Sequence, residues 1–410
     1  MKWAEIPLSK LLADSQSGTW GSAPKEDGSD LPVIRSTNIH DSNLVMDDIA
    51  YRAVSEKSAK RYQLLDGDII VTTSSGSRHL IGKNALFQQP EDGQRYLYSN
   101  FTLRLRPRQD VIIPRYLHFY LNSSNAKGEL LRIQSTTSGL RNLPVPLYLA
   151  QTVPLPAPSE QRHIIEILDQ ADSLRKKRAQ AEGKAARILP SLFYKMFGDP
   201  VTNPKGLVKR KLGELIKVRS GNFLPAKNMD PAGHYPVYGG NGINGYHSEF
   251  MFDHPVIVLG RVGIYCGAIH YSESQCWVTD NALYVAEKSK DLRSRYLAEA
   301  LRVANLNQYA GRAGQPLISG SRIYPIEILV PPIEQQEVFA NRMADLHADE
   351  KRRQDAGEHI ERLFSVLLHR AFTGDLTAKW RKTHMKEVSV EMEEQAKVLG
   401  TTKHTKDKGK

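Results

Sequence analysis

Cysteine is scarce in this chain. Cys266 and Cys276 are its only cysteines among 410 residues, and both lie in the second half. Disulfides or thiolate-bound zinc are therefore not expected to hold the first half together. Long apolar runs are missing too, so neither a signal peptide nor a membrane-spanning helix is expected. These absences are typical of a cytoplasmic protein in a reducing compartment.

Sequence motifs of catalysis are also missing. The chain has no Gly-x-x-x-x-Gly-Lys-Ser/Thr phosphate loop. Its one Pro-Pro pair, Pro331-Pro332, precedes isoleucine, so there is no Asn/Asp-Pro-Pro-aromatic tetrapeptide of the kind that DNA methyltransferases use. Acidic residues are scattered, and histidines such as His79, His247 and His270 lack the spacing of metal ligands. The sequence predicts no catalytic centre, no metal and no cofactor in this chain.

Residues 240–245 match the pattern Gly-x-Gly-x-x-Gly, which in other proteins marks a dinucleotide site. A strand is expected before them, over 235–238, but Tyr246 and His247 follow where the motif requires a helix. A plain turn, or a loop whose backbone approaches a ligand or DNA, is the favoured interpretation.

The dominant positive feature is a duplication. Residues 155–162 open a long helical stretch that ends at Phe197-Gly198-Asp199, and residues 330–336 open another that ends at Phe372-Thr373-Gly374-Asp375. Short helices expected near 114–121 and 295–303 indicate one mixed α+β fold in both globular parts. The predicted order is globular domain 1–158, long helix 159–199, globular domain 200–332, long helix 333–375 and a basic tail 376–410. The tail is rich in lysine, and disorder is expected after Trp380.

The two long segments carry apolar residues at alternating steps of three and four. Each is about 40 residues long, roughly 60 Å as a helix. Pro190 is expected to kink the first helix near its end. Ordinary amphipathic core helices are the alternative to a coiled-coil spacer. The seam residues are Ile164, Leu174, Ile188, Leu192, Phe339, Leu346, Ile360, Leu363 and Leu367.

Charge favours a polyanionic partner. The chain has 56 Lys and Arg against 45 Asp and Glu, a net charge of +11. The segment 333–375 reverses this balance, with six basic and nine acidic residues. Nucleic acid is therefore expected to contact the globular parts, and protein the second long helix.

Several polar loops have the composition of base-reading surfaces, because arginine binds guanine bidentately and Asn or Gln binds adenine. For any single residue an ordinary solvated loop is the alternative. Parallel placement in both halves favours DNA binding. The candidates are Arg35, Ser36, Thr37, Asn38, Ser77, Arg78, His79, Lys83, Arg141 and Asn142 in the first half, and Gly240, Asn241, Asn244, Arg261, Gln315 and Arg322 in the second.

The duplicated motifs resemble those of type I restriction-modification specificity subunits. The resemblance rests on Pro156-x-Pro158-x-Glu160-Gln161, Pro331-Pro332-x-Glu334-Gln335, Phe197-Gly198-Asp199, and residues 371–377 with Trp380-Arg381. Gly67-Asp68-Ile69 and Tyr235-Pro236-Val237-Tyr238-Gly239 also resemble parts of the family's target-recognition domains. The match covers essentially residues 3–381. Pro190 and the lysine-rich tail depart from the family's usual pattern.

The resemblance implies a DNA-binding subunit in host defence that is not catalytic by itself. Each globular domain would read one half of a bipartite, asymmetric DNA site. The long helices would pack antiparallel as a coiled-coil spacer and bind two modification subunits, with Glu160, Gln161, Glu334 and Gln335 at the helix starts. The modification subunit would bring S-adenosylmethionine and methylate adenine at N6, and a restriction subunit would bring ATP and Mg. A single-chain restriction-methylation enzyme and a protein-interaction scaffold that does not bind DNA are the alternatives.

Overall fold

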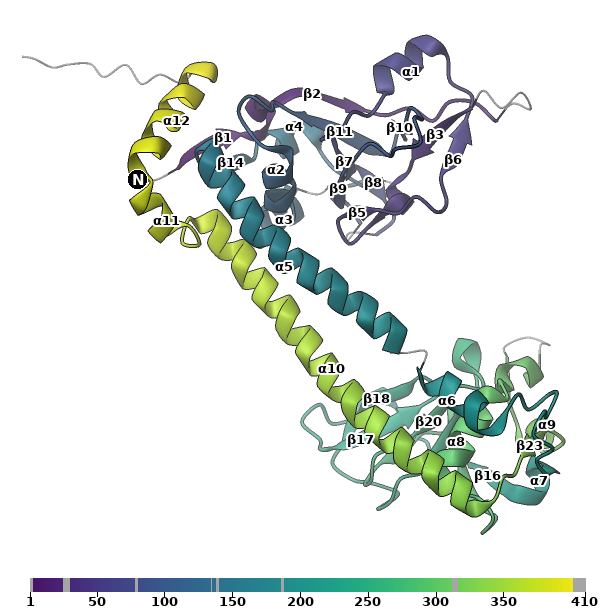
Figure 1. Cartoon of the computed structure of the whole chain (residues 1–410). Helices are drawn as coiled ribbons and strands as arrows, with labels where there is room; N and C mark the ends of the chain where they lie inside the picture. The colour runs from purple at the N-terminus through teal and green to yellow at the C-terminus, as the bar shows by residue number, and fades with distance from the viewer. Residues whose placement is uncertain are drawn as a thin grey trace, which may run out of the picture. The chain divides into compact units, whose positions relative to one another are not determined.

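A computed structural model of the chain describes residues 3–24, 30–77, 80–133, 135–137, 140–185, 188–311 and 316–400. The chain forms two compact units (Figure 1). Unit 1 comprises Met1–Lys177 with Gly357–Lys410, and unit 2 comprises Arg178–Ala356. Each of the two long helices therefore contributes one part to each unit. Among the described residues, no helix is long and apolar enough to cross a membrane.

Unit 1 is a mixed α+β structure that also holds the last described helices of the chain. Its strands are β1 (Ala4–Pro7), β2 (Leu12–Ser17), β3 (Leu31–Ile34), β4 (Ile39–His40), β5 (Asn43–Leu44), β6 (Ala50–Arg52), β7 (Ile69–Thr72), β8 (Ser74–Ser75), β9 (Asn84–Leu86), β10 (Leu97–Tyr98), β11 (Thr102–Pro107), β12 (Ser135–Thr137), β13 (Leu140–Asn142) and β14 (Thr152–Leu155). Its helices are α1 (Glu56–Tyr62), α2 (Pro114–Leu121), α3 (Ser124–Ile133), α4 (Val145–Ala150), the first part of α5 (Pro158–Ala185), the end of α10 (Ile333–Thr373), α11 (Ala378–Thr383) and α12 (Met385–Val398).

Unit 2 repeats the same mixture. Its strands are β15 (Lys209–Lys211), β16 (Ile216–Ser220), β17 (Tyr235–Gly239), β18 (Gly242–His247), β19 (Ile257–Gly260), β20 (Ile269–Tyr271), β21 (Trp277–Val278), β22 (Ala282–Lys288) and β23 (Glu327–Leu329). Its helices are α6 (Ile188–Phe197), α7 (Leu212–Leu215), α8 (Ser294–Val303), α9 (Gly320–Ile323), the end of α5 and the first part of α10.

The sheets of the two units match strand for strand. The four-stranded antiparallel sheet runs β2-β11-β7-β9 in unit 1 and β16-β22-β19-β20 in unit 2. A second sheet has one parallel pair in each unit, β10 with β3 and β21 with β17. The α+β class and the internal repeat are confirmed, and the short helices α2 and α8 lie where the sequence predicts them.

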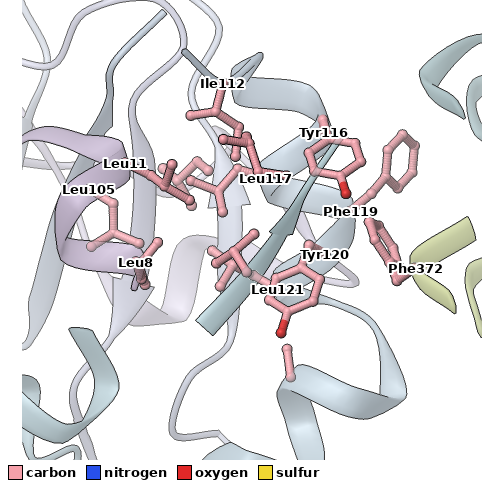
Figure 2. Close-up of a cluster of buried hydrophobic side chains, with 14 of the residues drawn as sticks. Leu8, Leu11, Leu105, Ile112, Tyr116, Leu117, Phe119, Tyr120, Leu121 and Phe372 are labelled. Carbon is pink, nitrogen blue, oxygen red and sulfur yellow. The ribbon is translucent and has the colours of Figure 1, made fainter. Parts of the chain in front are cut away.

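The core of each unit is completed by the end of the long helix that begins in the other. In unit 1, Phe372 at the end of α10 packs edge-on against Tyr116 of α2, with ring centroids 5.4 Å apart (Figure 2). In unit 2, Phe197 at the end of α6 packs in the same way against Tyr296 of α8, at 5.0 Å. All four rings lie in the buried cores.

Within each unit the helices run antiparallel. In unit 1, Arg175 of α5 forms an ion pair with Glu361 of α10 at 3.3 Å, and the start of α5 shares a core with the end of α10. In unit 2, Glu182 lies 3.6 Å from Arg353, and the end of α6 shares a core with the start of α10.

The predicted apolar seam is only partly correct. Ile164 and Phe339 are fully buried, but Leu174 is 65% exposed and Leu363 is 50% exposed, so their assignment to a buried seam is wrong. The helices bury the faces that pack on the globular cores, and these include Leu168 and Leu368. A straight helix drifts from a 3.5-residue repeat, which the stepping pattern assumes. Leu192, Leu346, Ile360 and Leu367 are half-buried, and the side chain of Ile188 lies outside the described part.

The first long helix is described as two segments, α5 and α6, with two undescribed residues between them. Pro190 is the third residue of α6. Residues 186 and 187 lie outside the described residues, so the kink predicted at Pro190 stays a prediction.

The prediction of disorder after Trp380 is wrong as far as residue 400. Helices α11 and α12 occupy this segment, and Val388 and Gln395 of α12 are buried. One face of α12 is thus buried by packing that a count of lysines does not reveal. The final residues, 401–410, lie outside the described residues.

Candidate nucleic-acid interface

Both four-stranded sheets end in a glycine turn of the same construction. Gly18 follows β2, and a Cβ there would lie 2.1 Å from the carbonyl oxygen of Tyr98. Gly221 follows β16, and a Cβ there would lie 2.2 Å from the carbonyl oxygen of Val278. Only glycine permits backbones to approach this closely. The two turns are therefore structural equivalents.

An aromatic residue stands two positions after each glycine. Trp20 is half-buried, with the guanidinium of Arg52 4.1 Å from the centre of its ring. Phe223 is 74% exposed. Sequence reasoning missed both residues, although the repeated Gly-x-aromatic spacing after a strand was a usable signal. An exposed ring can contact thymine methyl groups in the major groove or insert between base steps of a duplex.

The first candidate loops of the two halves follow equivalent strands. The amide of Ser99 donates to the carbonyl of Ile34 at 2.9 Å, and the amide of Thr279 donates to that of Tyr238 at 2.9 Å. Residues 35–38 come directly after Ile34, and residues 239–244 directly after Tyr238. The structure therefore brings these two predicted loops to matching positions.

Hydrogen bonds of its own side chains hold the loop at 35–38 in place. Nη2 of Arg35 donates to Oδ2 of Asp48 at 2.8 Å. Asn38 is 3% exposed; its Oδ1 accepts the amide of Arg35 at 2.9 Å and its Nδ2 donates to two backbone carbonyls. Both amide hydrogens of Asn38 are used inside the loop, so its prediction as a base-reading residue is wrong. Thr37 is exposed and Ser36 half-buried, and both stay candidates.

The glycine-rich segment of unit 2 is a hairpin turn. Gly239 pairs with Gly242, whose φ is +91°, and β18 continues to His247. No helix follows, so the context of a dinucleotide site is missing. Gly240 is half-buried, while Asn241 and Asn244 are exposed and available to hydrogen-bond a ligand.

We call the loops that follow β2, β3, β7, β16, β17 and β19 the strand-end loops. Arg261 lies in the loop that follows β19. Its Nη1 donates to Oγ of Ser220 at 3.2 Å and to the carbonyl of Asp280 at 3.4 Å. Ile264 and Tyr265 follow in the same loop and are 83% and 45% exposed. The side chains that emerge here combine a cation with apolar surface, which suits contact with phosphates and with base edges in a groove.

The equivalent loop in unit 1 contains Ser77. The amide of Leu143 donates to the carbonyl of Thr73 just as the amide of Ile318 donates to that of Arg261, which establishes the equivalence. Ser77 is half-buried. Asn142 accepts a 2.6 Å hydrogen bond from the hydroxyl of Ser74.

Two predicted cations lie in other surroundings. Lys83 lines a cavity beside α3 with Asn122 and Lys127, and Arg322 lines one with Lys209 and Tyr309. None of the strand-end loop residues named above lines either cavity. The remaining candidates, Arg78, His79 and Gln315, lie outside the described residues, as does the side chain of Arg141 on β13.

The strongly perturbed titratable groups are interior. Burial, together with the nearby Arg115, lowers the pKa of His118 to about 3. Burial raises the pKa of the Cys266 and Cys276 thiols. In the described part of the chain, no group of three or more His, Cys, Asp or Glu is arranged to hold a metal ion. The polar side chains of the strand-end loops offer hydrogen bonds and charge, which is the chemistry of binding.

A buried glutamine fixes each long helix to its globular part. Oε1 of Gln161 accepts the amide of Ile113 at 2.8 Å, and Nε2 donates to the carbonyl of Pro156 at 2.9 Å. Oε1 of Gln336 accepts the amide of Arg293 at 2.9 Å, and Nε2 donates to the carbonyl of Pro331 at 2.8 Å. Both glutamines are fully buried.

The counterpart of Gln161 is therefore Gln336, which the sequence prediction did not select. Glu334 and Gln335 are exposed, so pairing them with Glu160 and Gln161 is wrong by one residue. The Glu-Gln dipeptide stands one position earlier in the second motif, and only the hydrogen bonds reveal the shift.

Glu160 joins three distant segments of unit 1. It is fully buried and accepts hydrogen bonds from Nε1 of Trp3 at 3.0 Å, Oγ1 of Thr377 at 2.5 Å and Nε of Arg381 at 2.8 Å. A buried carboxylate is tolerated because a cation and two further donors satisfy it. Glu160 and Gln161 have no surface left for another subunit, so the part of the prediction that assigns them to subunit contact is wrong.

Comparison with known proteins agrees with this architecture. The family of type I restriction modification DNA specificity domains matches residues 3–182 and 204–356. The Escherichia coli EcoprrI specificity subunit is 27% identical over 82% of this chain and 85% of its own length. The Salmonella potsdam StySPI specificity subunit is 25% identical over 86% of this chain and 83% of its own length.

Solved structures of the same kind share the fold. The S subunit from M. genitalium is 14% identical with a TM-score of 0.57 over 91% of this chain and 96% of its own. A chain from a type I restriction-modification system is 16% identical with a TM-score of 0.56 over 92% of this chain and 98% of its own. With the family matched twice, once in each half, the chain belongs to the type I restriction-modification DNA specificity family.

Proposed function

We propose that this chain is the specificity subunit of a type I restriction-modification complex, and that each unit reads one half of a bipartite, asymmetric site in double-stranded DNA. One observation carries the proposal. The strand-end loops are built on the same backbone frame in both units, yet present different side chains. Trp20 lies beside Arg52 in unit 1, whereas Phe223 is exposed in unit 2. A repeated frame with different hydrogen-bonding groups suits the reading of two different base sequences.

The long helices set the spacing of the half-sites and bind two modification subunits. Support comes from Leu174, Leu363 and Val366, which leave apolar surface exposed on the helical part of unit 1; exposed apolar patches mark protein-binding surfaces. The modification subunits bring S-adenosylmethionine and methylate adenine at N6. Restriction subunits bring ATP and Mg for cleavage, and this chain contributes neither a cofactor nor a catalytic residue.

Methylation mapping tests the assignment of half-sites. The chain is reconstituted with its modification subunit and S-adenosylmethionine, and the methylated adenines are sequenced. Asn241→Ala should relax recognition at one base of the half-site read by unit 2, by about 1–3 kcal/mol of discrimination. Thr37→Ala should affect only the other half-site.

Asn125 on α3 is exposed and provides the matched control: Asn125→Ala should leave both half-sites unchanged. If Asn241→Ala altered both half-sites, or if the complex bound DNA without the steep salt dependence of phosphate contacts, the proposal would be wrong. Methyl transfer by the purified chain alone would equally contradict its non-catalytic role.

A further inference from the structure

The start of α5 is covered by the C-terminal helices of the same chain. The amide of Ser159 donates to Oε2 of Glu391 at 2.8 Å. Nε2 of Gln395 donates to the carbonyl of Val111 at 2.8 Å. The ring of Trp380 stacks on that of His163, with centroids 5.0 Å apart. Unit 1 thus holds α11 and α12 as an occupant on the first turns of its long helix (Figure 1).

The start of α10 offers the corresponding surface in unit 2. Counting from the buried glutamines Gln161 and Gln336, Glu334 corresponds to Ser159 and Val338 to His163. Glu334 is exposed and Val338 is 47% exposed. In the described part of unit 2, no helix equivalent to α11 or α12 covers this surface.

The backbone acceptors show the same difference. In unit 1, the carbonyl of Val111 accepts from both Gln161 and Gln395. In unit 2, the corresponding carbonyl of Asp291 accepts from Gln336 at 2.8 Å, and no second side-chain donor reaches it among the described residues. Exposed apolar side chains also lie near the start of α10: Val338 is 47% exposed, and Val208, whose carbonyl accepts the amide of Val330, is 62% exposed. The start of α10 therefore offers the same kind of surface that α11 and α12 cover in unit 1, but no helix of the described chain covers it.

We infer that the chain carries one helix-binding surface twice, that α11 and α12 occupy the copy in unit 1, and that the copy in unit 2 binds a helix of the modification subunit. This inference rests on the proposed function. The internal repeat alone predicts two equivalent binding sites for the modification subunit, whereas here one of the two sites is already covered. A modification subunit reaches the part of this surface around Ser159 and Val111 only after α12 is displaced.

The acidic charge of Glu337 makes the surface of unit 2 unsuitable for binding α12. Arg162 lies 3.5 Å from Glu391 in unit 1, but its counterpart in unit 2 is Glu337, which already pairs with Arg293. A helix with glutamate at that point would meet a carboxylate. The fitting helix presents an apolar residue to Val338 and a side-chain donor to the carbonyl of Asp291, without an acid near Glu337. The α12 helix of a second copy carries Glu391 at that point and does not meet these requirements.

Removing α12 alone provides the test. A chain that ends at His384 keeps Trp380 and Arg381 and loses Val388, Glu391 and Gln395. The modification subunit is titrated against the full and shortened chains, and its copies are counted by native mass spectrometry. The full chain should bind a second subunit at least about tenfold more weakly than the first, and the shortened chain should reduce this difference to below about threefold.

Three point variants separate displacement from misfolding. Val388 is fully buried and Val390 is 57% exposed on the same helix. Val388→Asp should free α12 and reproduce the shortened chain, whereas Val390→Asp should behave as the natural chain. Val338→Asp should weaken the first, tighter binding event by about tenfold.

Equal affinities for both subunits in the full chain, unchanged by removal of α12, would overturn the inference and leave the proposed function intact. A Val338→Asp chain that binds the first subunit normally would also overturn it. If neither chain bound the modification subunit at all, the proposed function would fail as well.

Discussion

Gln161 and Gln336 form equivalent pairs of hydrogen bonds. The Oε1 of each accepts a backbone amide just before a helix of the globular part, and the Nε2 of each donates to a backbone carbonyl just before a long helix. Truncation leaves these buried groups without partners, which costs about 2–4 kcal/mol. Gln161→Ala should therefore destabilise unit 1 and Gln336→Ala unit 2 by that amount. Native-state hydrogen exchange at α2 and α8 measures each loss separately. Gln335 is exposed, and an equal loss on Gln335→Ala would contradict the register assigned to these glutamines.

His118 should make unit 1 sensitive to acid. Burial lowers its pKa in the folded chain to about 3, against an ordinary value of 6.5. Between these two pH values the unfolded chain binds a proton that the folded chain does not. Stability should therefore fall by about 1.4 kcal/mol per pH unit as the pH drops from 6.5 towards 3. Urea unfolding of unit 1 at several pH values measures this slope.

Two histidine variants test whether His118 causes this pH dependence of stability. His118→Gln should remove most of that slope. His369 is exposed on the part of α10 that belongs to unit 1, and His369→Gln should leave the slope unchanged. An unchanged slope in His118→Gln would show that other groups cause the acid sensitivity.

The glycine turns at the sheet ends are the elements on which the candidate interface depends. A Cβ at Gly18 would meet a carbonyl oxygen at 2.1 Å, so Gly18→Ala must shift the turn that carries Trp20. We expect the affinity of the assembled complex for DNA to fall at least tenfold, with the defect confined to the half-site of unit 1, as measured by fluorescence anisotropy with altered half-sites. Gly128 of α3 has no atom within 4 Å of its Cβ position, and a Gly128→Ala chain should bind DNA normally. Equal effects of the two substitutions would argue against a role for the turn.

The local sequence pattern predicts where the short helices lie, but it does not predict which face of each long helix is buried. The short helices α2 and α8 follow from local sequence, because their apolar residues repeat with the helical period. The buried faces of α5 and α10 do not, because they depend on which strands and helices they meet. Leu174 and Leu363 fit a two-helix seam by spacing alone, and both are exposed.

The proposed spacing role of the long helices predicts how the whole complex responds to insertion. Four residues added after Ala179 in α5 and four after Asp355 in α10 would lengthen both helices by about 6 Å. Because ten base pairs span about 34 Å, the preferred gap between half-sites should grow by one or two base pairs while both half-sites stay the same. Methylation mapping gives this readout. Four residues inserted after Gly93, in a loop of unit 1, should not change the gap; an altered half-site with an unchanged gap would refute the spacing role.

Local sequence was sufficient to identify the duplication, the α+β class and the loops that follow equivalent strands, because these depend on residues close together in the chain. Contacts between distant residues settled the rest. Trp3 and Arg381 both reach Glu160 across sequence separations of 157 and 221 residues, and no spacing pattern encodes such a contact. For the same reason, the burial of Asn38, the pairing of Gln161 with Gln336, and the completion of each core by Phe372 or Phe197 emerged only from the folded chain, where packing decides which side chains remain free to bind.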